Sequence, residues 1–290
     1  MEILVLVKDV PDRAEPLVVE GDAVKDTGVV YGLGPWEEMA LEEALSLKTK
    51  HGGTVTAITF GPEKADRGLR EAMTMGADQA VRAWAPELPA HDPRSVADAL
   101  ANVCRSLPFD LIIGGVRSSG GSTGLVIPYL GSILNIPVVS GVVHLRFDNG
   151  SNSLRVQQQA GKGDRRVLEC GLPAALGVEK SENEPRYPTM YGRLASERTP
   201  ITLWEPGPGK NERPEPLVDL VGLARARPKP KKIFAPDSNL SAAERMKLIL
   251  SGGVDKKRGP ASAASDGESG ARQILECLKQ SDILKTGATN

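Results

Sequence analysis

A stretch of small residues between two apolar segments is the part of this sequence best suited to bind a ligand. It covers residues 118–124 and reads SSGGSTG. The apolar run Leu111-Ile112-Ile113 before it is short enough for a buried strand, and an apolar segment of helical length follows from Leu125. Free N–H groups and a partial positive charge at a helix start attract phosphate, and glycines let the backbone approach a ligand closely. The order strand, loop, helix therefore predicts a phosphate site.

The loop matches neither of two common nucleotide-binding motifs. No Lys-Ser or Lys-Thr pair follows Gly124, so it is not a Walker A loop, and its glycine spacing is not GxGxxG. Backbone N–H groups can hold a phosphate without particular side chains, and Arg117, Ser118, Ser122 and Thr123 offer further donors. A strand-to-helix connection without a ligand remains the alternative, because such loops are common in α/β folds.

Side chains that could hold a metal ion or form disulfides have no suitable spacing. The chain has three cysteines and three histidines, which are Cys104, Cys170, Cys277, His51, His91 and His144. An odd number of distant cysteines suits a reducing compartment and argues against a disulfide framework. The histidines share no ligand spacing with each other or with the cysteines. We therefore expect no metal site.

Composition excludes several classes of partner. A net charge of −1 gives no argument for nucleic acid, and only 4% of the residues are aromatic. No apolar run approaches the roughly 18 residues of a membrane span. The N-terminus has an acid at position 2 and only a short apolar run, so it is expected to be a first strand and not a signal peptide. These features predict a cytoplasmic protein without nucleic-acid binding or membrane insertion.

The glycine loop lies within a regular alternation of strands and helices. Strands are expected at 2–8, 54–60, 79–85, 111–113 and from 137, and helices at 35–50, 63–75, 93–107 and 125–134. This order predicts an α/β fold with a Rossmann-like, doubly wound, mostly parallel sheet. Ligands of such sheets bind beyond the carboxyl ends of the strands. Leu6, Phe60 and the glycine loop should therefore line one crevice.

The pattern changes after the fifth strand. Residues 142–178 contain alternating runs around Asn149-Gly150, which is typical of an antiparallel extension. Residues 179–196 lose periodicity, and we expect an exposed loop at 185–192. After Trp204 the chain becomes linker-like and too poor in apolar residues to bury a core of its own. We therefore expect a nucleotide-binding domain at 1–205, and at 206–290 a linker and arm with short helices that lies on a partner or across the main domain.

Several motifs together resemble one known family. Residues 8–12, KDVPD, look like the opening K-x-V-P-D of the electron transfer flavoprotein β (small) subunit, and residues 34–44, GPWEEMALEEA, are similar to its N-P-F-D-E-x-A-L-E-E-A helix start. Residues 61–62 and 72–78 resemble its second strand-helix unit, and residues 185–190, PRYPTM, its recognition loop. The resemblance extends from Met1 to about Trp204.

The resemblance implies a subunit without catalytic side chains of its own. It would form a heterodimer with an α subunit that holds the electron-carrying FAD, and its C-terminal arm would reach onto that subunit. Its own crevice would bind AMP, or a second FAD in electron-bifurcating members. The apolar tip of the recognition loop would dock into redox partner dehydrogenases, with Met190 at the tip beside Tyr187 and Tyr191. The cofactor-binding positions are then Leu6, Gly34, Pro35, Phe60, Arg117, Ser118, Gly120, Gly121, Ser122, Thr123, Gly124 and Leu125.

The loop departs from the family's G-K-Q-A-I-D-x-D-x-x-Q-x-G. Two aspartates are replaced by Gly120 and Ser122, the glutamine by Leu125, and Lys-Gln by Val116-Arg117. The asparagine before Pro35 is replaced by Gly34. Loss of carboxylates removes repulsion of a phosphate, whereas loss of side-chain hydrogen bonds weakens specificity for the rest of the ligand. AMP is the first expectation, and FAD or an empty crevice in a structural subunit stays open.

A second class of function also stays open. Similar sheets occur in stand-alone proteins that bind or hydrolyse ATP. The glycine loop has no lysine or paired acid placed for metal-nucleotide hydrolysis, so the electron-carrier subunit is the preferred hypothesis.

Overall fold

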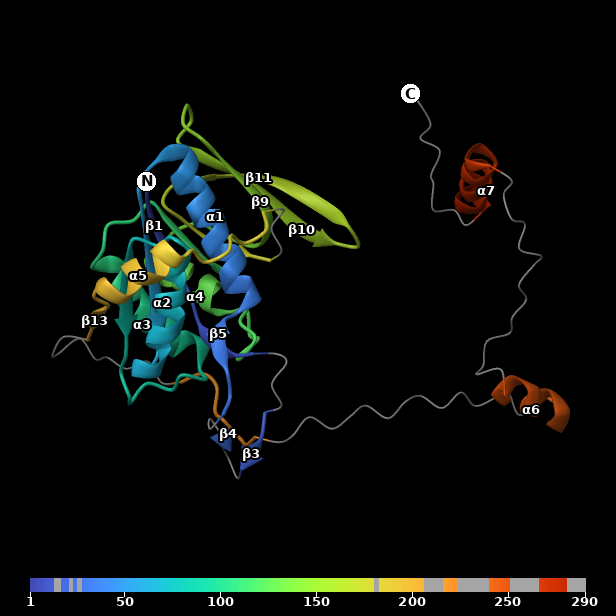
Figure 1. Cartoon of the computed structure of the whole chain (residues 1–290), viewed down its shortest axis with the longest axis horizontal. Helices are drawn as coiled ribbons and strands as arrows, with labels where there is room; N and C mark the ends of the chain where they lie inside the picture. Colours follow the sequence, from blue (N-terminus) through green and yellow to red (C-terminus); the bar gives the residue numbers. More distant parts are fainter. Residues whose placement is uncertain are drawn as a thin grey trace. The chain divides into compact units, whose positions relative to one another are not determined.

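A computed structural model describes residues 1–12, 17–20, 23–24, 28–179, 183–205, 216–223, 240–250 and 266–280. The chain divides into two units, residues 1–225 and 226–290. The described part of the second unit consists of helices α6 (Ala242–Leu250) and α7 (Gly267–Gln280) (Figure 1). In neither unit do the described residues form a helix long and apolar enough to cross a membrane.

The first unit is built on a mixed sheet of nine strands in the order β11-β10-β9-β12-β8-β1-β6-β7-β13 (Figure 1). Its parallel part contains β1 (Glu2–Leu6), β6 (Thr54–Phe60), β7 (Gln79–Ala83), β8 (Leu111–Gly115), β12 (Ala174–Val178) and β13 (Thr202–Trp204). Strand β9 (Val138–Asp148) is parallel to β12, and β10 (Ser153–Gly161) and β11 (Asp164–Gly171) extend the sheet with antiparallel pairing. The predicted α/β class and the antiparallel extension are confirmed.

Helices cover both faces of this sheet because the strands alternate their side chains between two cores. Ile3 and Val5 of β1 pack with α1 (Pro35–His51) and α2 (Asp66–Met75), which follows a short 3-10 turn η1 (Glu63–Ala65). Leu4 and Leu6 pack on the opposite face with α3 (Pro93–Arg105) and α4 (Val126–Leu134). All four strand residues are buried. This alternation has the period of two residues expected of a strand that is buried on both faces.

Two small ribbons precede α1. Strand β2 (Asp9–Pro11) pairs with β5 (Tyr31–Leu33), and β3 (Val19–Glu20) pairs with β4 (Ala23–Val24). The first pair brings the chain from the end of β1 to the start of α1. It therefore places Lys8 and Gly34 at the same edge of the sheet.

The expectation of a loop at residues 185–192 is wrong in its second half, because helix α5 spans Met190–Arg198. Thr189 caps this helix, since its Oγ1 accepts a hydrogen bond from the backbone N–H of Gly192 at 2.9 Å. A threonine at this position satisfies an otherwise unpaired donor of the first turn. The segment has too weak a hydrophobic periodicity to predict a helix, but Thr189 is a residue type that commonly caps one.

Candidate functional site

The predicted crevice lies at the carboxyl ends of three adjacent strands. β1 is the central strand, with β6 on one side and β8 on the other. Leu6, Phe60 and the glycine loop therefore end or follow neighbouring strands, as the sequence predicts. The Leu6 side chain itself is buried in the core under α3 and α4, and Phe60 packs against Trp84 with ring centroids 5.4 Å apart. At these two positions the backbone is better placed than the side chain to meet a ligand.

The glycine loop forms a compact turn. The carbonyl oxygen of Ser118 accepts hydrogen bonds from the backbone N–H of Ser122 at 2.9 Å and from its Oγ at 3.1 Å, and Gly121 donates to Ser118 Oγ at 3.2 Å. Ser122 and Gly124 have φ values of 52° and 67°, the left-handed region that glycine enters at little cost. Two of the amides that we predicted as phosphate donors are thus already used inside the turn. Those of Gly120, Thr123 and Gly124 donate no hydrogen bond within the described residues.

Lys8 lies next to the glycine loop, although it is absent from the predicted site residues. A methyl group at position 121 would lie 3.8 Å from Nζ of Lys8. Burial lowers the pKa of Lys8, and the nearby Glu37 carboxylate raises it. Lys8 is nevertheless an exposed residue. The sequence signal was its position directly after β1, within the KDVPD motif.

Helix α1 starts beside this crevice and brings a buried acid with it. Glu37 is only 4% exposed, and its Oε2 has no hydrogen-bond partner among the described residues. The side chain turns back over Gly34, so that a methyl group at position 34 would overlap Oε2. Burial raises the pKa of Glu37 to about 7, against the smaller opposing effects of its own backbone and of Lys8. Glu37 is not among the site residues that the sequence predicts.

Arg117 is held at the side of the loop. Its guanidinium carbon lies 4.6 Å from the centre of the Trp36 ring, a cation–π distance, and its Nη2 is 3.6 Å from Oε1 of Glu179. The indole N–H of Trp36 donates to the same carboxylate oxygen at 3.4 Å. This cluster joins the end of β8 to the start of α1 and the end of β12. Arg117 therefore forms an ion pair with Glu179, whereas the sequence suggested that it could donate a hydrogen bond to a phosphate.

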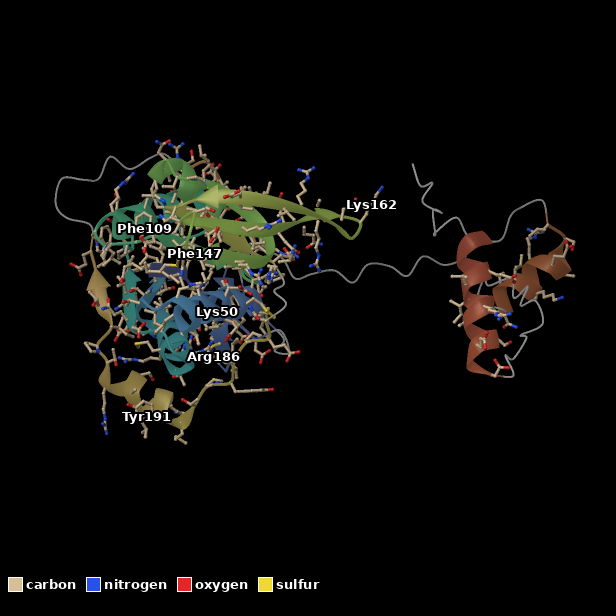
Figure 2. All side chains as sticks on the ribbon, turned by 90° about the horizontal axis from the view of Figure 1, so that it is seen from above. Lys50, Phe109, Phe147, Lys162, Arg186 and Tyr191 are labelled. Atoms are coloured by element: carbon tan, nitrogen blue, oxygen red, sulfur yellow. The ribbon has the colours of Figure 1, made fainter. Side chains whose placement is uncertain are left out.

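The second predicted surface is strongly exposed. Tyr187, Met190 and Tyr191 are 91%, 73% and 84% exposed, and Figure 2 shows Tyr191 on α5 at the edge of the domain. Arg186 fixes the segment before the helix, since its Nε and Nη2 donate to the two oxygens of the buried Glu42 carboxylate at 2.8 and 2.9 Å. The structure thus brings the three predicted docking residues together on a well-anchored segment.

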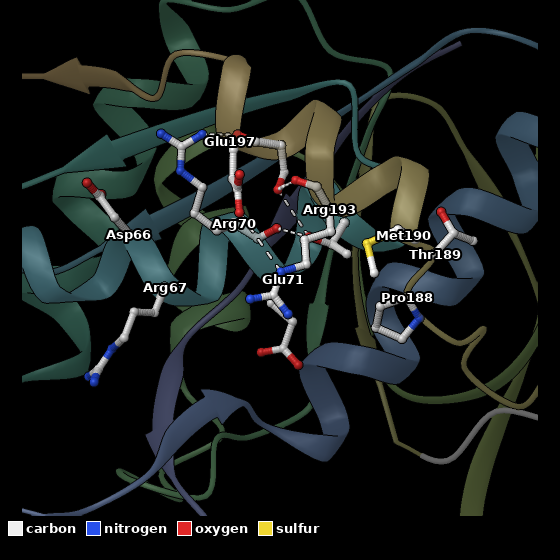
Figure 3. Close-up of a pocket in the computed structure, with 11 residues that line it drawn as sticks. Asp66, Arg67, Arg70, Glu71, Pro188, Thr189, Met190, Arg193 and Glu197 are labelled. Carbon is white, nitrogen blue, oxygen red and sulfur yellow. Dashed lines mark hydrogen bonds and ion pairs between the residues drawn. The ribbon is translucent and has the colours of Figure 1, made fainter.

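Helix α5 is seated on α2 by several polar contacts. Arg70 of α2 donates to the backbone carbonyls of Ser196 and Thr199, at the C-terminal end of α5. Gly192 lies so close to Thr74 that a methyl group there would overlap the Thr74 carbonyl oxygen. A groove of about 760 Å³ remains between the two helices, with Met190 and Arg193 on one wall and Arg70 and Glu71 on the other (Figure 3). Met190 and Tyr191 therefore lie on a helix that is held against α2 beside an open groove, and Tyr187 lies in the segment before this helix.

The described residues contain no group of histidine, cysteine, aspartate or glutamate side chains placed to hold a metal ion. Cys104 and Cys170 are both buried free thiols. Burial raises the pKa of Cys104 to about 12, which keeps this thiol protonated and unreactive.

The sequence of the chain matches known proteins of one family. Residues 23–208 match the family model of the electron transfer flavoprotein domain. The chain is 35% identical over 202 residues to the electron transfer flavoprotein subunit beta of Bacillus subtilis, covering 69% of this chain and 77% of that protein. The chain belongs to the electron transfer flavoprotein β-subunit family. Its place there is supported by the subunit beta of Megasphaera elsdenii, 32% identical over 249 residues (81% of this chain, 88% of the relative).

The chain is also similar to a protein that carries a different name. Protein FixA of Azotobacter vinelandii is 29% identical over 263 residues, which cover 89% of this chain and 91% of FixA. The range of the electron transfer flavoprotein domain includes the start of α1, the glycine loop and α5. Family membership therefore gives the chain a role in electron transfer, and the matched range contains α5 and the part of the crevice that follows residue 23.

Proposed function

We propose that this chain is the β subunit of a heterodimeric electron transfer flavoprotein. It pairs with a flavin-binding α subunit and shuttles electrons from dehydrogenases to a downstream acceptor in the cytoplasm. Membership of the β-subunit family is the observation that carries this proposal. The chain contributes no acid, base or nucleophile to the reaction; it positions the flavin subunit and the redox partners.

The crevice is proposed to bind AMP. Three features support a phosphate at this place: the amides of Gly120, Thr123 and Gly124, which donate no hydrogen bond within the described residues, the Lys8 ammonium group, and the start of α4 without an acidic residue in its first turn. The backbone at Leu6, Gly34, Pro35 and Phe60 would surround the remainder of the nucleotide. When a second FAD occupies the crevice in place of AMP, it supplies a further redox centre.

Identification of the bound nucleotide tests this assignment. The full-length chain is co-expressed with its flavin-binding partner, and the purified pair is denatured and analysed by mass spectrometry. We expect one AMP and one FAD for each pair. Two FAD molecules would assign the crevice to a second flavin, and FAD without any nucleotide in this chain would reject the site.

The exposed segment 187–194 is proposed as the surface that docks dehydrogenases. Tyr187, Met190, Tyr191 and Leu194 form an apolar patch there, and such patches mark interaction sites more often than single exposed residues do. Arg186 and Arg70 hold the patch in one conformation. A preorganised surface loses less conformational entropy when it binds a partner.

The C-terminal region 206–290 is proposed as an arm on the α subunit. Its two described helices expose large apolar side chains, namely Met246, Ile249, Ile274 and Leu275. Contact with a partner would remove this surface from water, which is favourable by about 25 cal/mol for each Å². Co-purification of the two subunits tests this assignment directly.

A further inference from the structure

The proposed phosphate site contains a carboxyl group that a bound phosphate would repel in its charged form. Glu37 is buried in the first turn of α1, and its Oε2 has no partner among the residues that the structure describes. A buried carboxylate without hydrogen bonds is unfavourable, so the group gains by binding a proton or by meeting a donor. Gly34, the N-cap residue, has no side chain to cap α1, and the hydrogen bond from the backbone of Glu37 itself offsets the effect of burial on the Glu37 pKa only in part.

The charges that face Glu37 come from few elements. Lys8 at the end of β1 attracts its negative charge, and Glu38 on the same helix repels it. Within the loop, residues 118–124 carry no titratable side chain, and the neighbouring Arg117 interacts with Trp36 and Glu179. Lys8 is therefore a cation that faces both Glu37 and the glycine loop.

We propose that Glu37 binds a proton when a nucleotide phosphate enters the crevice, so that ligand affinity falls as Glu37 ionises. The inference rests on the proposed nucleotide site. With Glu37 ionised, the carboxylate and the phosphate compete for Lys8 and repel each other. With Glu37 neutral, Lys8 is available to the phosphate, and the carboxyl O–H becomes a hydrogen-bond donor. The proton comes from the solvent, and no other covalent bond changes.

The ionisation behaviour of Glu37 fits this role. Its pKa of about 7 keeps the carboxyl group partly protonated near neutral pH. Uptake of a proton then costs little, and the approach of a phosphate raises the pKa further. The sign is therefore definite: AMP binds more tightly below pH 7 and more weakly above it.

Gly34 provides an independent way to disturb the acid. Its backbone has φ −70° and ψ 151°, which alanine adopts without strain. A methyl group there would overlap Oε2 of Glu37, so Gly34→Ala should displace this flexible side chain towards water while the main chain stays in place. Displacement restores an ordinary carboxyl pKa and removes the linkage above pH 7.

Calorimetric titration with AMP tests the proposal. The full-length chain, purified with its partner and freed of nucleotide, is compared as wild type, Glu37→Gln and Gly34→Ala between pH 6.5 and 8.5. Each titration is repeated in two buffers of different ionisation enthalpy, which measures proton uptake. For wild type we expect affinity to fall towards tenfold per pH unit above 7, the limit for one linked proton, with uptake of up to one proton. Glu37→Gln should bind at pH 8.5 as tightly as wild type does at pH 6.5.

The controls separate Glu37 from other titrating groups. The second ionisation of a phosphate monoester lies near pH 6, and this effect is the same in all three proteins. A pH slope equal in wild type and Glu37→Gln would belong to AMP or Lys8 and would overturn the proposal, as would loss of binding in Glu37→Gln at every pH. If Glu37→Gln does not fold, the pH slope of Gly34→Ala decides in its place, and a slope equal to that of wild type would overturn the proposal. Absence of AMP binding by every variant at every pH rejects the nucleotide site, and the proposal with it.

Discussion

At the scale of single residues, the crevice is governed by two opposite charges at the ends of different elements. Lys8 follows β1 and is exposed to solvent over part of its surface, whereas Glu37 is buried in the first turn of α1. Burial shifts each pKa towards the neutral form, which is the effect expected when a charge leaves water. Neither residue belongs to the glycine loop, yet Lys8 lies next to the loop and interacts with Glu37.

Replacement of Lys8 should weaken nucleotide binding. Loss of a charge-assisted hydrogen bond costs about 1.5–3 kcal/mol, so Lys8→Met is expected to weaken AMP binding by roughly tenfold to a hundredfold. Lys50→Met is the matched control, because Lys50 is exposed near the far end of α1 (Figure 2). Equal affinities for AMP in the two variants, measured by calorimetry, would exclude Lys8 from the site.

Replacement of Glu37 should change the stability of the chain with a definite sign. The folded-state pKa of about 7 lies above the ordinary value of 4.5, so the folded chain binds more protons than the unfolded chain between these values. Stability therefore falls as pH rises from 4.5 to 7. Glu37→Gln should be more stable than wild type at pH 8, by up to about 3 kcal/mol, and should lose this advantage at pH 4.5. Urea unfolding at both pH values measures the difference, with the exposed Glu197→Gln as control.

At the scale of elements, the packing of α5 on α2 positions the residues proposed for docking. Arg70 satisfies carbonyl groups at the end of α5 that would otherwise lack partners. Arg186 pairs with the buried Glu42 before the helix begins. The apolar patch at 187–194 is thus anchored at both ends, although its own side chains are exposed.

Gly192 is the residue at which this seating is most sensitive. Alanine is the better helix former by about 1 kcal/mol, but its methyl group would overlap the Thr74 carbonyl oxygen. We expect Gly192→Ala to destabilise the domain by about 1–3 kcal/mol and to speed hydrogen exchange in α5. In Gly171→Ala the new methyl group meets no atom within 4 Å, so this control should stay within about 0.5 kcal/mol of wild type. Unchanged exchange in α5 of Gly192→Ala would contradict the tight seating.

At the scale of the whole molecule, the chain combines a self-sufficient sheet domain with a C-terminal unit of different character. The domain up to residue 225 contains both hydrophobic cores. The described helices of the second unit have mostly exposed side chains. The domain is therefore expected to fold without the second unit, and the second unit to require a partner surface.

Removal of residues 226–290 should separate folding from assembly. The truncated chain should keep its cooperative thermal transition within a few degrees of the full chain, since a loss of about 1 kcal/mol would shift it by roughly 2–4 °C. It should lose most of the co-purified flavin, measured by visible absorbance. Retention of a full flavin complement would show that the second unit is dispensable for pairing.

Much of the fold followed from local pattern, because strands buried on both faces and amphipathic helices have distinct periods. The glycine loop was found in the same way, from small residues between an apolar strand and an apolar helix. Lys8 and Glu37 were missed as a pair, since nothing local relates a residue after β1 to one in the first turn of α1. The start of α5 was missed because its capping signal, Thr189, lies in a segment of weak periodicity.

The sequence by itself determined the order of strands and helices, the position of the loop and the resemblance to a family of electron carriers. These depend on residue types at fixed spacing along the chain. Tertiary structure alone decided which groups meet in the crevice: that Gly121 and Ser122 use their amides inside the turn, that Arg117 lies against Trp36, and that Glu37 is buried near Lys8. The charge states and hydrogen bonds of these groups depend on how deeply each is buried and on which distant residues lie beside it. The spacing of residue types along the sequence determines neither the burial nor these neighbours.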